Sequence, residues 1–293
     1  MSTTGESADL YIASLRARHV PTNTIKAYTH DLRHFVAAVP TDLDQVTAPV
    51  IQQFLEGDGH LSTATQARRY STLCAFYHWI IRQELCTSNP MERLDPITQP
   101  KREPRPLADA DVMKIFKAIP TSNIRDRTLF MLLYETGVRV GEMLALQVSD
   151  VTLAQDDEKL RIFAKGQRER TVMLTAAPES IRLLRRHFKQ SHITSGSVFR
   201  GDPRYGGSPL PLTYSVVHKA WQKYCQEAEV SATIHQLRHS RATQLIQAGV
   251  PVTTVRKHLG HRNLQSTLRY AEVDQSTVKA DLLEYQRRKA RER

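Results

Sequence analysis

A proline-rich segment divides this chain after about its first third. Residues 96–106 carry four prolines and three basic residues. Proline fixes its own φ angle and lacks an amide hydrogen, so such a segment stays extended and semi-rigid. A chain of 293 residues is long enough for about two domains. We therefore predict a domain at 1–95, a linker at 96–106 and a second domain at 107–293.

The first domain is predicted to be helical. Apolar residues recur over 25–39 at the spacing of a helix with one buried face, and Pro40 ends that helix. Thr47 is a candidate N-cap for a short helix, and Ser62 begins a long helix that carries an apolar stripe. These segments indicate a small helical bundle.

The second domain is predicted to be mainly helical with a small β-hairpin or sheet (α+β). A helix capped by Asp109 or Asp111 runs to Ile119, and Gly137 stops an apolar helix by adopting the left-handed conformation. Two β-prone runs around a turn at 166–167 predict a hairpin. Later helices are expected at 178–190 and 213–229, the second of which carries residues expected to be mostly core: Val216, Val217, Ala220, Trp221 and Tyr224.

Polar residues suited to phosphate binding follow near the C-terminus. His235 and Arg238 are three positions apart, so on a helix they share one face. His261 and Tyr270 come later in the same segment. Because arginine offers a planar fork of donors, this group can form a phosphate site. Spacing alone equally permits a helix end with solvated charges.

Earlier positions add further charged groups. Arg139 lies in a turn between two apolar helices, where burying a guanidinium is costly unless an anion meets it. Glu142 follows three residues later. Lys165 lies at the tip of the predicted hairpin, a position that taken alone is typical of a solvated turn residue.

In order and spacing, these positions resemble the tyrosine recombinase (phage integrase) family, and within it the Xer-type recombinases. The matching pattern is Arg139, Lys165, His235-x-x-Arg238, His261 and Tyr270, with the acid of the family's Arg-x-x-Glu at Glu142. The resemblance is close over the second half of the chain and looser over the first. It implies a two-domain, C-shaped DNA clamp, with an N-terminal helical core-binding (SAM-like) domain and a C-terminal catalytic domain that ends in a basic tail helix.

The resemblance implies a site-specific DNA recombinase. Such an enzyme cleaves and rejoins strands through a 3′-phosphotyrosyl link and exchanges them between two duplexes, in integration, excision or dimer resolution. Tyr270 is then expected to attack the phosphorus, although a phenol with a pKa near ~10 is a poor nucleophile. Arg139 and Arg238 are expected to hold the two non-bridging oxygens and stabilise their charge without a metal.

The remaining roles also come from the resemblance. Lys165 is expected to be the general acid on the leaving 5′-oxygen. His261 is expected to donate a hydrogen bond to the phosphate, and His235 to assist proton movement. Glu142 is expected to brace Arg139 or a nearby main-chain group. Among rival tyrosines, Tyr270 has the family's interval after Gly-His, whereas three others are expected to be packing residues: Tyr214, Tyr224 and Tyr285.

The charge of the chain favours double-stranded DNA as partner. The formal net charge is +11; the first 100 residues hold 8 basic and 10 acidic residues, and the rest hold 33 and 20. Positive charge favours a polyanion, although a basic surface can also serve solubility alone. Candidate DNA contacts, each equally at home in solvent, are Thr22, Thr24, Lys26, Tyr28, Arg68, Arg69, Lys101, Arg102 and Arg105.

Composition argues against several other classes of protein. The three cysteines are scattered without a C-x-x-C pattern, which argues against a disulfide framework or a zinc site. No apolar run approaches the ~18 residues of a membrane span, and the N-terminus lacks a signal sequence. We expect a cytoplasmic protein with reduced thiols, no metal, no cofactor and no membrane contact.

The expected assembly is a homo-tetramer on two DNA sites, with or without a partner recombinase. An apolar stripe on the expected helix 276–285 requires a partner surface, either on a neighbouring subunit or at home. Two alternatives keep the scaffold but change the activity. One is a type IB topoisomerase that relaxes supercoils as a monomer, and the other is a DNA-binding regulator without catalysis.

Overall fold

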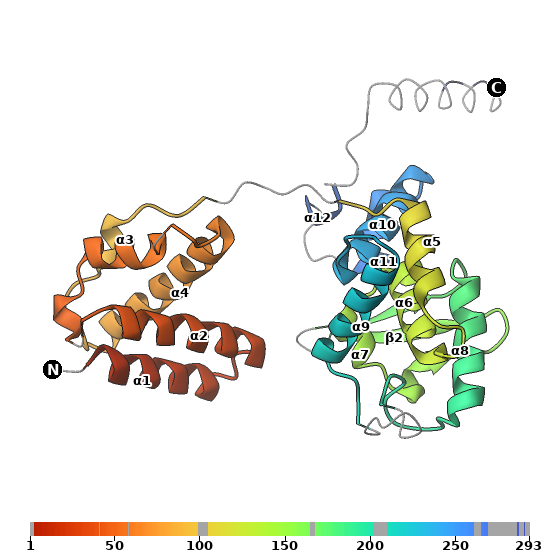
Figure 1. Ribbon diagram of the computed structural model, residues 1–293, viewed down its shortest axis with the longest axis horizontal. Helices are drawn as coiled ribbons and strands as arrows, with labels where there is room; N and C mark the ends of the chain where they lie inside the picture. The colour runs from red at the N-terminus through yellow and green to blue at the C-terminus, as the bar shows by residue number, and fades with distance from the viewer. Residues whose placement is uncertain are drawn as a thin grey trace. The chain divides into compact units, whose positions relative to one another are not determined.

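The computed structural model describes residues 3–40, 42–57, 59–98, 105–164, 168–201, 210–260 and 265–268, with the single positions 286 and 290. The chain forms two compact units, Met1–Arg102 and Glu103–Arg293, and each has its own hydrophobic core (Figure 1). The division between the units falls inside the predicted linker. The limits of the linker itself stay a prediction, and its residues 99–104 lie outside the described ranges.

The first unit is a helical bundle. Ser62 caps its longest helix by accepting from the amide of Thr65, as its position before the apolar stripe predicts. Phe35 and Tyr77 are completely buried and their rings meet edge to face, so α2 and α4 share one core. The helices are α1 (Thr4–Ala17), α2 (Thr22–Ala38), α3 (Ala48–Glu56) and α4 (Thr63–Arg82), with 3-10 turns at Leu43–Gln45 and Pro90–Arg93.

Helix α1 is absent from the sequence-based prediction. Its buried face includes small or polar residues such as Thr4, Ser7 and Ala8 next to Tyr11. The apolar periodicity of α1 is therefore weak, although Thr3 and Glu6 form a capping box at its start. Packing against α2 stabilises this helix, although its hydrophobic pattern does not predict it.

The second unit combines helices with a three-stranded antiparallel sheet of order β1-β2-β3. This arrangement confirms the predicted fold class. The helices are α5 (Asp109–Ala118), α6 (Ile124–Thr136), α7 (Val140–Leu144), α8 (Pro178–Ser191), α9 (Tyr214–Glu227), α10 (Ile234–Gln247), α11 (Val252–Leu259) and α12 (Gln265–Leu268), and the strands are β1 (Val151–Thr152), β2 (Lys159–Ala164) and β3 (Arg168–Met173).

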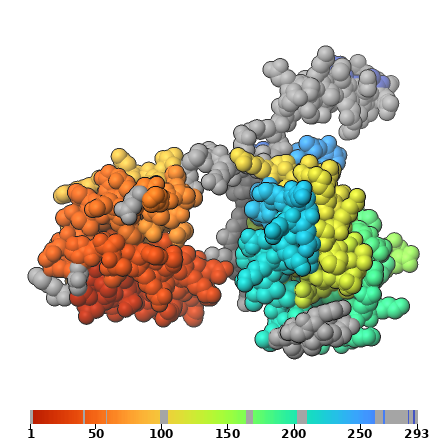
Figure 2. Space-filling view, viewed as in Figure 1, coloured from red at the N-terminus to blue at the C-terminus, as the bar shows by residue number. Residues whose placement is uncertain are grey.

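Helix α6 is the centre of the second unit. It buries residues on all sides, among them Leu129, Phe130 and Leu133, and a helix that is apolar all round belongs in a core. Helices α8 and α10 pack against it, and Phe130 meets the ring of Trp221 on α9 at 4.9 Å between centroids. Helix α5 packs on α9, and these two lie next to each other on the face shown in Figure 2.

Two details of the second unit differ from the prediction. The N-cap of α5 is Ala108, so Asp109 and Asp111 lie in the first turn, where their charge favours the helix dipole. Val216 is 48% exposed, because it lies in the first turn of α9 while Val217 beside it faces the core. Among the helices described, none has the length and apolar character needed to cross a bilayer.

Candidate active site

The turn between α6 and α7 positions Arg139. Gly137 caps α6 with a left-handed φ of 64°, which glycine adopts without the steric cost of a Cβ. A Cβ at Gly137 would also lie 2.5 Å from Cδ2 of Leu259 on α11, so the close approach of α11 requires glycine as well. The hydroxyl of Thr136 accepts from the amide of Val138 at 3.3 Å. Arg139 follows as the N-cap residue of α7.

Helix α10 brings Arg238 to the same turn. Thr233 and Gln236 form the capping box that starts this helix. Arg238 is only 3% exposed. Its Nη1 donates to the carbonyl oxygen of Gly137 at 2.5 Å, and its Nη2 donates to that of Leu259 at 2.9 Å. These carbonyls compensate the cost of burying the guanidinium.

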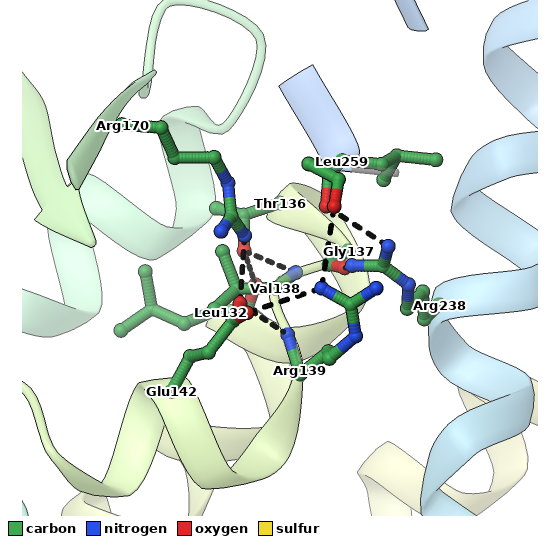
Figure 3. Close-up of polar contacts among 10 residues, drawn as sticks. Leu132, Thr136, Gly137, Val138, Arg139, Glu142, Arg170, Arg238 and Leu259 are labelled. Carbon is green, nitrogen blue, oxygen red and sulfur yellow. Dashed lines mark hydrogen bonds and ion pairs between the residues drawn. The ribbon is translucent and has the colours of Figure 1, made fainter. Parts of the chain in front are cut away.

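The acceptors for both arginines lie at the ends of two helices. Gly137 caps α6, and Gly260 caps α11 with a φ of 69°. Arg139 Nη1 donates to the carbonyl oxygen of Gly260 at 3.4 Å. The last carbonyls of a helix lack partners within the helix and carry the negative end of its dipole, so they attract cations. Two helix ends thus hold Arg139 and Arg238 around one turn (Figure 3).

Glu142 on α7 is a carboxylate shared by two arginines. Its Oε1 accepts from Arg139 Nη1 at 3.1 Å, and its Oε2 accepts from Arg170 Nη2 at 2.7 Å and from the Arg139 amide at 3.4 Å. Burial by itself raises the pKa of Glu142, but the hydrogen bonds and charges of Arg170 and Arg139 outweigh burial and lower that pKa. Glu142 is therefore ionised at neutral pH and braces both the side chain and the backbone of Arg139.

The cluster in Figure 3 carries surplus positive charge. Two guanidinium groups, those of Arg139 and Arg170, bind the carboxylate of Glu142. The third, that of Arg238, donates to backbone carbonyl oxygens instead. The side chain of Arg139 is 42% exposed, so its charge remains accessible to a ligand. Fixed donors that carry positive charge favour an anion. A phosphate diester has two non-bridging oxygens, which suit the pair Arg139 and Arg238.

His235 lies one helical turn before Arg238 on α10, and its side chain is exposed. Its ring centroid is 4.5 Å from that of His239 in an edge-on arrangement. Partial desolvation, followed by the positive charges of Arg238 and Arg139, lowers the pKa of His235. His235 is therefore neutral at pH 7 in the free protein and can accept a proton.

Three of the predicted catalytic residues, Lys165, His261 and Tyr270, lie outside the described residues. Their described neighbours are informative. The backbones of Ala164 and Arg168 pair across the hairpin on either side of 165–167. Gly260, which directly precedes His261, is the acceptor for Arg139. The roles of these three residues stay predictions.

In the first unit, Thr22 and Lys26 are exposed at the start of α2. They line a hollow together with Arg16 on α1 and with His30 and Arg33 on α2. Thr24 is half-buried, and Tyr28 is half-buried with its ring stacked on Tyr11 at 6.3 Å. Tyr28 therefore contributes to packing, and DNA contact by these four residues stays a prediction.

The other predicted DNA contacts differ in their surroundings. Arg68 forms an ion pair with buried Asp31, and Arg69 donates to the carbonyl of Phe54 at 3.4 Å while its guanidinium lies 4.6 Å from that ring. Both arginines thus have partners inside the unit. The side chain of Arg105 is exposed, and its carbonyl accepts from Gln236 on α10 at 3.1 Å. Lys101 and Arg102 lie outside the described residues.

The two described rival tyrosines differ in burial. Tyr224 is buried, and its hydroxyl donates to Asp126 at 2.7 Å, which confirms its packing role. Tyr214 is 55% exposed and contacts the ring of His218, so the prediction that it is a packing residue is wrong. It lies at the first position of α9, where the helix has not yet reached the core.

Potential metal ligands are not clustered in the part of the chain that the structure describes. No group of three or more His, Cys, Asp or Glu side chains there could hold a metal ion. The thiols of Cys74, Cys86 and Cys225 are all free.

Sequence analysis assigned no role to Arg170, although the strand period could have identified it. Arg170 pairs with Ile162 across the hairpin and lies two residues before Val172, and both neighbours are buried. Side chains alternate between the faces of a strand, so Arg170 points inward with them. An arginine on a buried face requires an anion, and Glu142 meets that requirement.

Comparison with known proteins points to one family. The profile of the phage integrase family matches residues 105–277, and that of the phage integrase N-terminal SAM-like domain matches residues 8–84. Tyrosine recombinase XerC of Mycobacterium sp. (strain JLS) is 30% identical over 305 residues, covering 96% of this chain and 97% of the relative.

Solved structures share the fold. The XerH site-specific recombinase bound to palindromic difH substrate is 22% identical, with a TM-score of 0.73 over 96% of this chain and 85% of that one. A lambda integrase tetramer bound to a Holliday junction is 19% identical, with a TM-score of 0.76 over 94% of this chain and 80% of that one.

Proposed function

The chain belongs to the phage integrase family, and on that premise we propose that it is a site-specific DNA recombinase acting through a 3′-phosphotyrosyl intermediate. The observation that carries the proposal is the arginine pair held by the ends of α6 and α11. Arg139 and Arg238 are fixed by three backbone carbonyls, so their donors are preorganised around one point. Preorganised charge of this kind stabilises the oxygens of a phosphorane-like transition state.

Cleavage then proceeds by attack of the Tyr270 hydroxyl oxygen on the phosphorus. A bond forms between that oxygen and phosphorus as the bond to the 5′-oxygen breaks, and Lys165 gives the leaving oxygen its proton. Arg139 and Arg238 bind the non-bridging oxygens, and His261 adds a hydrogen bond. His235, neutral because its pKa is lowered, takes up a proton near the site.

The covalent step explains why rejoining requires no energy source. One phosphodiester bond is exchanged for one phosphotyrosyl bond, so attack by a 5′-hydroxyl can reverse the step without ATP. When the attacking hydroxyl comes from a second duplex, the product is an exchanged strand. Two duplexes and four cleavage sites call for a homo-tetramer, alone or with a partner recombinase, and the lambda integrase structure shows such a tetramer for that protein.

The contacts with DNA divide between the units. The second unit supplies the reacting groups and most of the positive charge, and we propose that the first unit holds the duplex through α2, with Thr22 and Lys26 on its exposed start. Arg105 extends the grip, because its carbonyl is tied to α10 while its side chain is exposed. Each neutralised phosphate releases counterions, so this grip weakens steeply with salt.

Strand exchange between two duplexes is the test of this function. A bound site is first selected from genomic fragments, and two labelled linear duplexes that carry it are then incubated with the protein. We expect joined products that contain one arm from each duplex. Relaxation of a supercoiled plasmid that lacks the site, without joined products, would instead identify a topoisomerase. Tight binding with neither product would identify a regulator.

A further inference from the structure

Arg170 on β3 occupies a position where an apolar residue would ordinarily stabilise the fold better. Its partner across the hairpin is Ile162, and Val172 lies two residues further along the same strand, on the same face. Both are buried in the core of the second unit, whereas the Arg170 side chain is 13% exposed. A buried ion pair often contributes no more to stability than hydrophobic residues of similar volume. Stability alone therefore does not account for an arginine here.

The hydrogen bonds of Arg170 make that point stronger. Nη2 donates to Glu142 Oε2 at 2.7 Å. Its Nε and Nη1 atoms are buried and have no hydrogen-bond partner among the residues that the structure describes. Buried donors without partners are costly and uncommon in native proteins, and they concentrate where function requires them.

The Arg170 guanidinium also lies directly against Gly260. A Cβ at Gly260 would be 2.8 Å from Cζ of Arg170 and 2.9 Å from Nε and Nη1. No side chain larger than glycine fits there without displacing the guanidinium. The glycine of Leu259-Gly260-His261 is thus needed for two reasons, its φ of 69° and its contact with Arg170.

One side chain therefore joins three parts of the site. Arg170 binds Glu142, which in turn binds Arg139. Arg170 also contacts Gly260 at the end of α11, whose carbonyl oxygen accepts from Arg139. Its strand, β3, begins directly after the hairpin turn. Figure 3 shows the carboxylate of Glu142 in contact with both Arg170 and Arg139.

We propose that Arg170 is a positioning residue for strand cleavage, which sets the places of Arg139 and of the chain entering His261 without touching the DNA. The proposal rests on the recombinase function. A planar guanidinium is required, because its Nη2 edge donates to Glu142 while its face packs against Gly260. The ammonium group of lysine can replace the charge but not that shape.

The test separates DNA binding from cleavage. Arg170→Lys and Arg170→Ala are compared with Arg161→Gln as matched control. Arg161 is also on the hairpin and forms an ion pair, with Asp150 at 2.8 Å, but its side chain is 47% exposed and makes no contact with the cluster around Glu142 in the described structure. We measure the affinity for a nicked site-bearing duplex and the rate of covalent adduct formation at saturating DNA.

Expected results distinguish positioning from folding. Both Arg170 variants should bind within about twofold of wild type and form adduct about 10- to 100-fold more slowly, while Arg161→Gln stays near wild type. Added methylguanidinium should restore part of the rate in Arg170→Ala. Equal cleavage rates in Arg170→Lys and wild type would overturn the proposal, as would weakened DNA binding that accounts for the whole loss.

A second pair of variants tests the contact with Gly260. Gly249 has a φ of 76° with no atom within 4 Å of an added Cβ, whereas Gly260 has a φ of 69° and meets Arg170. Gly249→Ala therefore reports backbone strain alone. Gly260→Ala should slow cleavage at least tenfold more than Gly249→Ala, and equal effects would contradict the contact. If wild type itself forms no adduct, the recombinase function fails and not this inference.

Discussion

At the scale of single residues, the balance of charge around Glu142 is the property on which the site depends. One carboxylate holds Arg139 on its exposed side and Arg170 on its buried side. The helix ends supply further acceptors for Arg139 and Arg238. The cluster thus brings three arginines and one glutamate together, an arrangement that favours the binding of a phosphate.

Replacing Glu142 should expose this dependence. Glu142→Gln leaves Arg170, 13% exposed, without an anionic partner, so we expect the second unit to lose about 3 kcal/mol of unfolding free energy at pH 7. Because the pKa of Glu142 is lowered from 4.5 in the fold, its contribution is complete above pH 4.5 and is lost as the pH falls through the folded-state value.

Urea unfolding of wild type and Glu142→Gln over a range of pH measures both effects. The two proteins should differ most at neutral pH and converge as the pH falls below 4.5. A difference that stays constant over that acidic range would show that the charge of Glu142 is not what stabilises the site.

At the scale of elements, two helix ends and one hairpin meet. Helix α10 connects them, because Arg238 reaches the ends of α6 and α11 while Ser240 accepts from the amide of Leu107 at 2.8 Å. The start of the second unit is thus tied to the helix that carries His235 and Arg238. Arg139 and Arg238 are both held by backbone carbonyls of neighbouring helices. The positions of these two side chains therefore depend on the close approach of α6, α10 and α11.

Substitution at the α6–α11 contact should disturb both stability and cleavage. Gly137 has a φ of 64°, and a Cβ added there would lie 2.5 Å from Cδ2 of Leu259. Gly196 has a φ of 76° with open space around it, so Gly196→Ala measures the backbone cost alone, about 1–2 kcal/mol. Gly137→Ala should destabilise the unit by about 1 kcal/mol more than that and slow adduct formation. Equal destabilisation of the two variants would mean that α11 does not pack as closely as described.

Sequence patterns were enough for the elements whose apolar faces are regular. The helices at α2, α4 and α6 and the hairpin follow from period and turn residues, and Gly137 takes the predicted left-handed conformation. They were not enough for α1, whose inner face is partly Thr and Ser, nor for Val216, whose place depends on where α9 first meets the core. The partner of Arg170 could not be read from sequence either, because it depends on tertiary contact.

The site shows the same division. The matching order of motifs was enough to name Arg139, Glu142, His235 and Arg238, and the structure brings Arg139, Glu142 and Arg238 to one turn. That the arginines are held by carbonyls at helix ends is a consequence of packing between α6, α10 and α11. No spacing in the sequence encodes it.

At the scale of the whole molecule, the chain forms two compact units, and our proposal assigns the chemistry to the second. The candidate catalytic groups all belong to the second unit, which also holds the excess of basic residues. The first unit adds an exposed helix start with Thr22 and Lys26. The account as a whole therefore depends on a covalent link between Tyr270 and DNA.

Covalent trapping tests that link most directly. Wild type, Tyr270→Phe and Tyr214→Phe are incubated with a nicked suicide duplex that carries the bound site, and denaturing gels reveal protein–DNA adducts. Tyr214 is the control because it is 55% exposed and has no part in the proposed chemistry. We predict an adduct with wild type and Tyr214→Phe and none with Tyr270→Phe. An adduct that persists in Tyr270→Phe, or no adduct from wild type on DNA that it binds, would contradict the account.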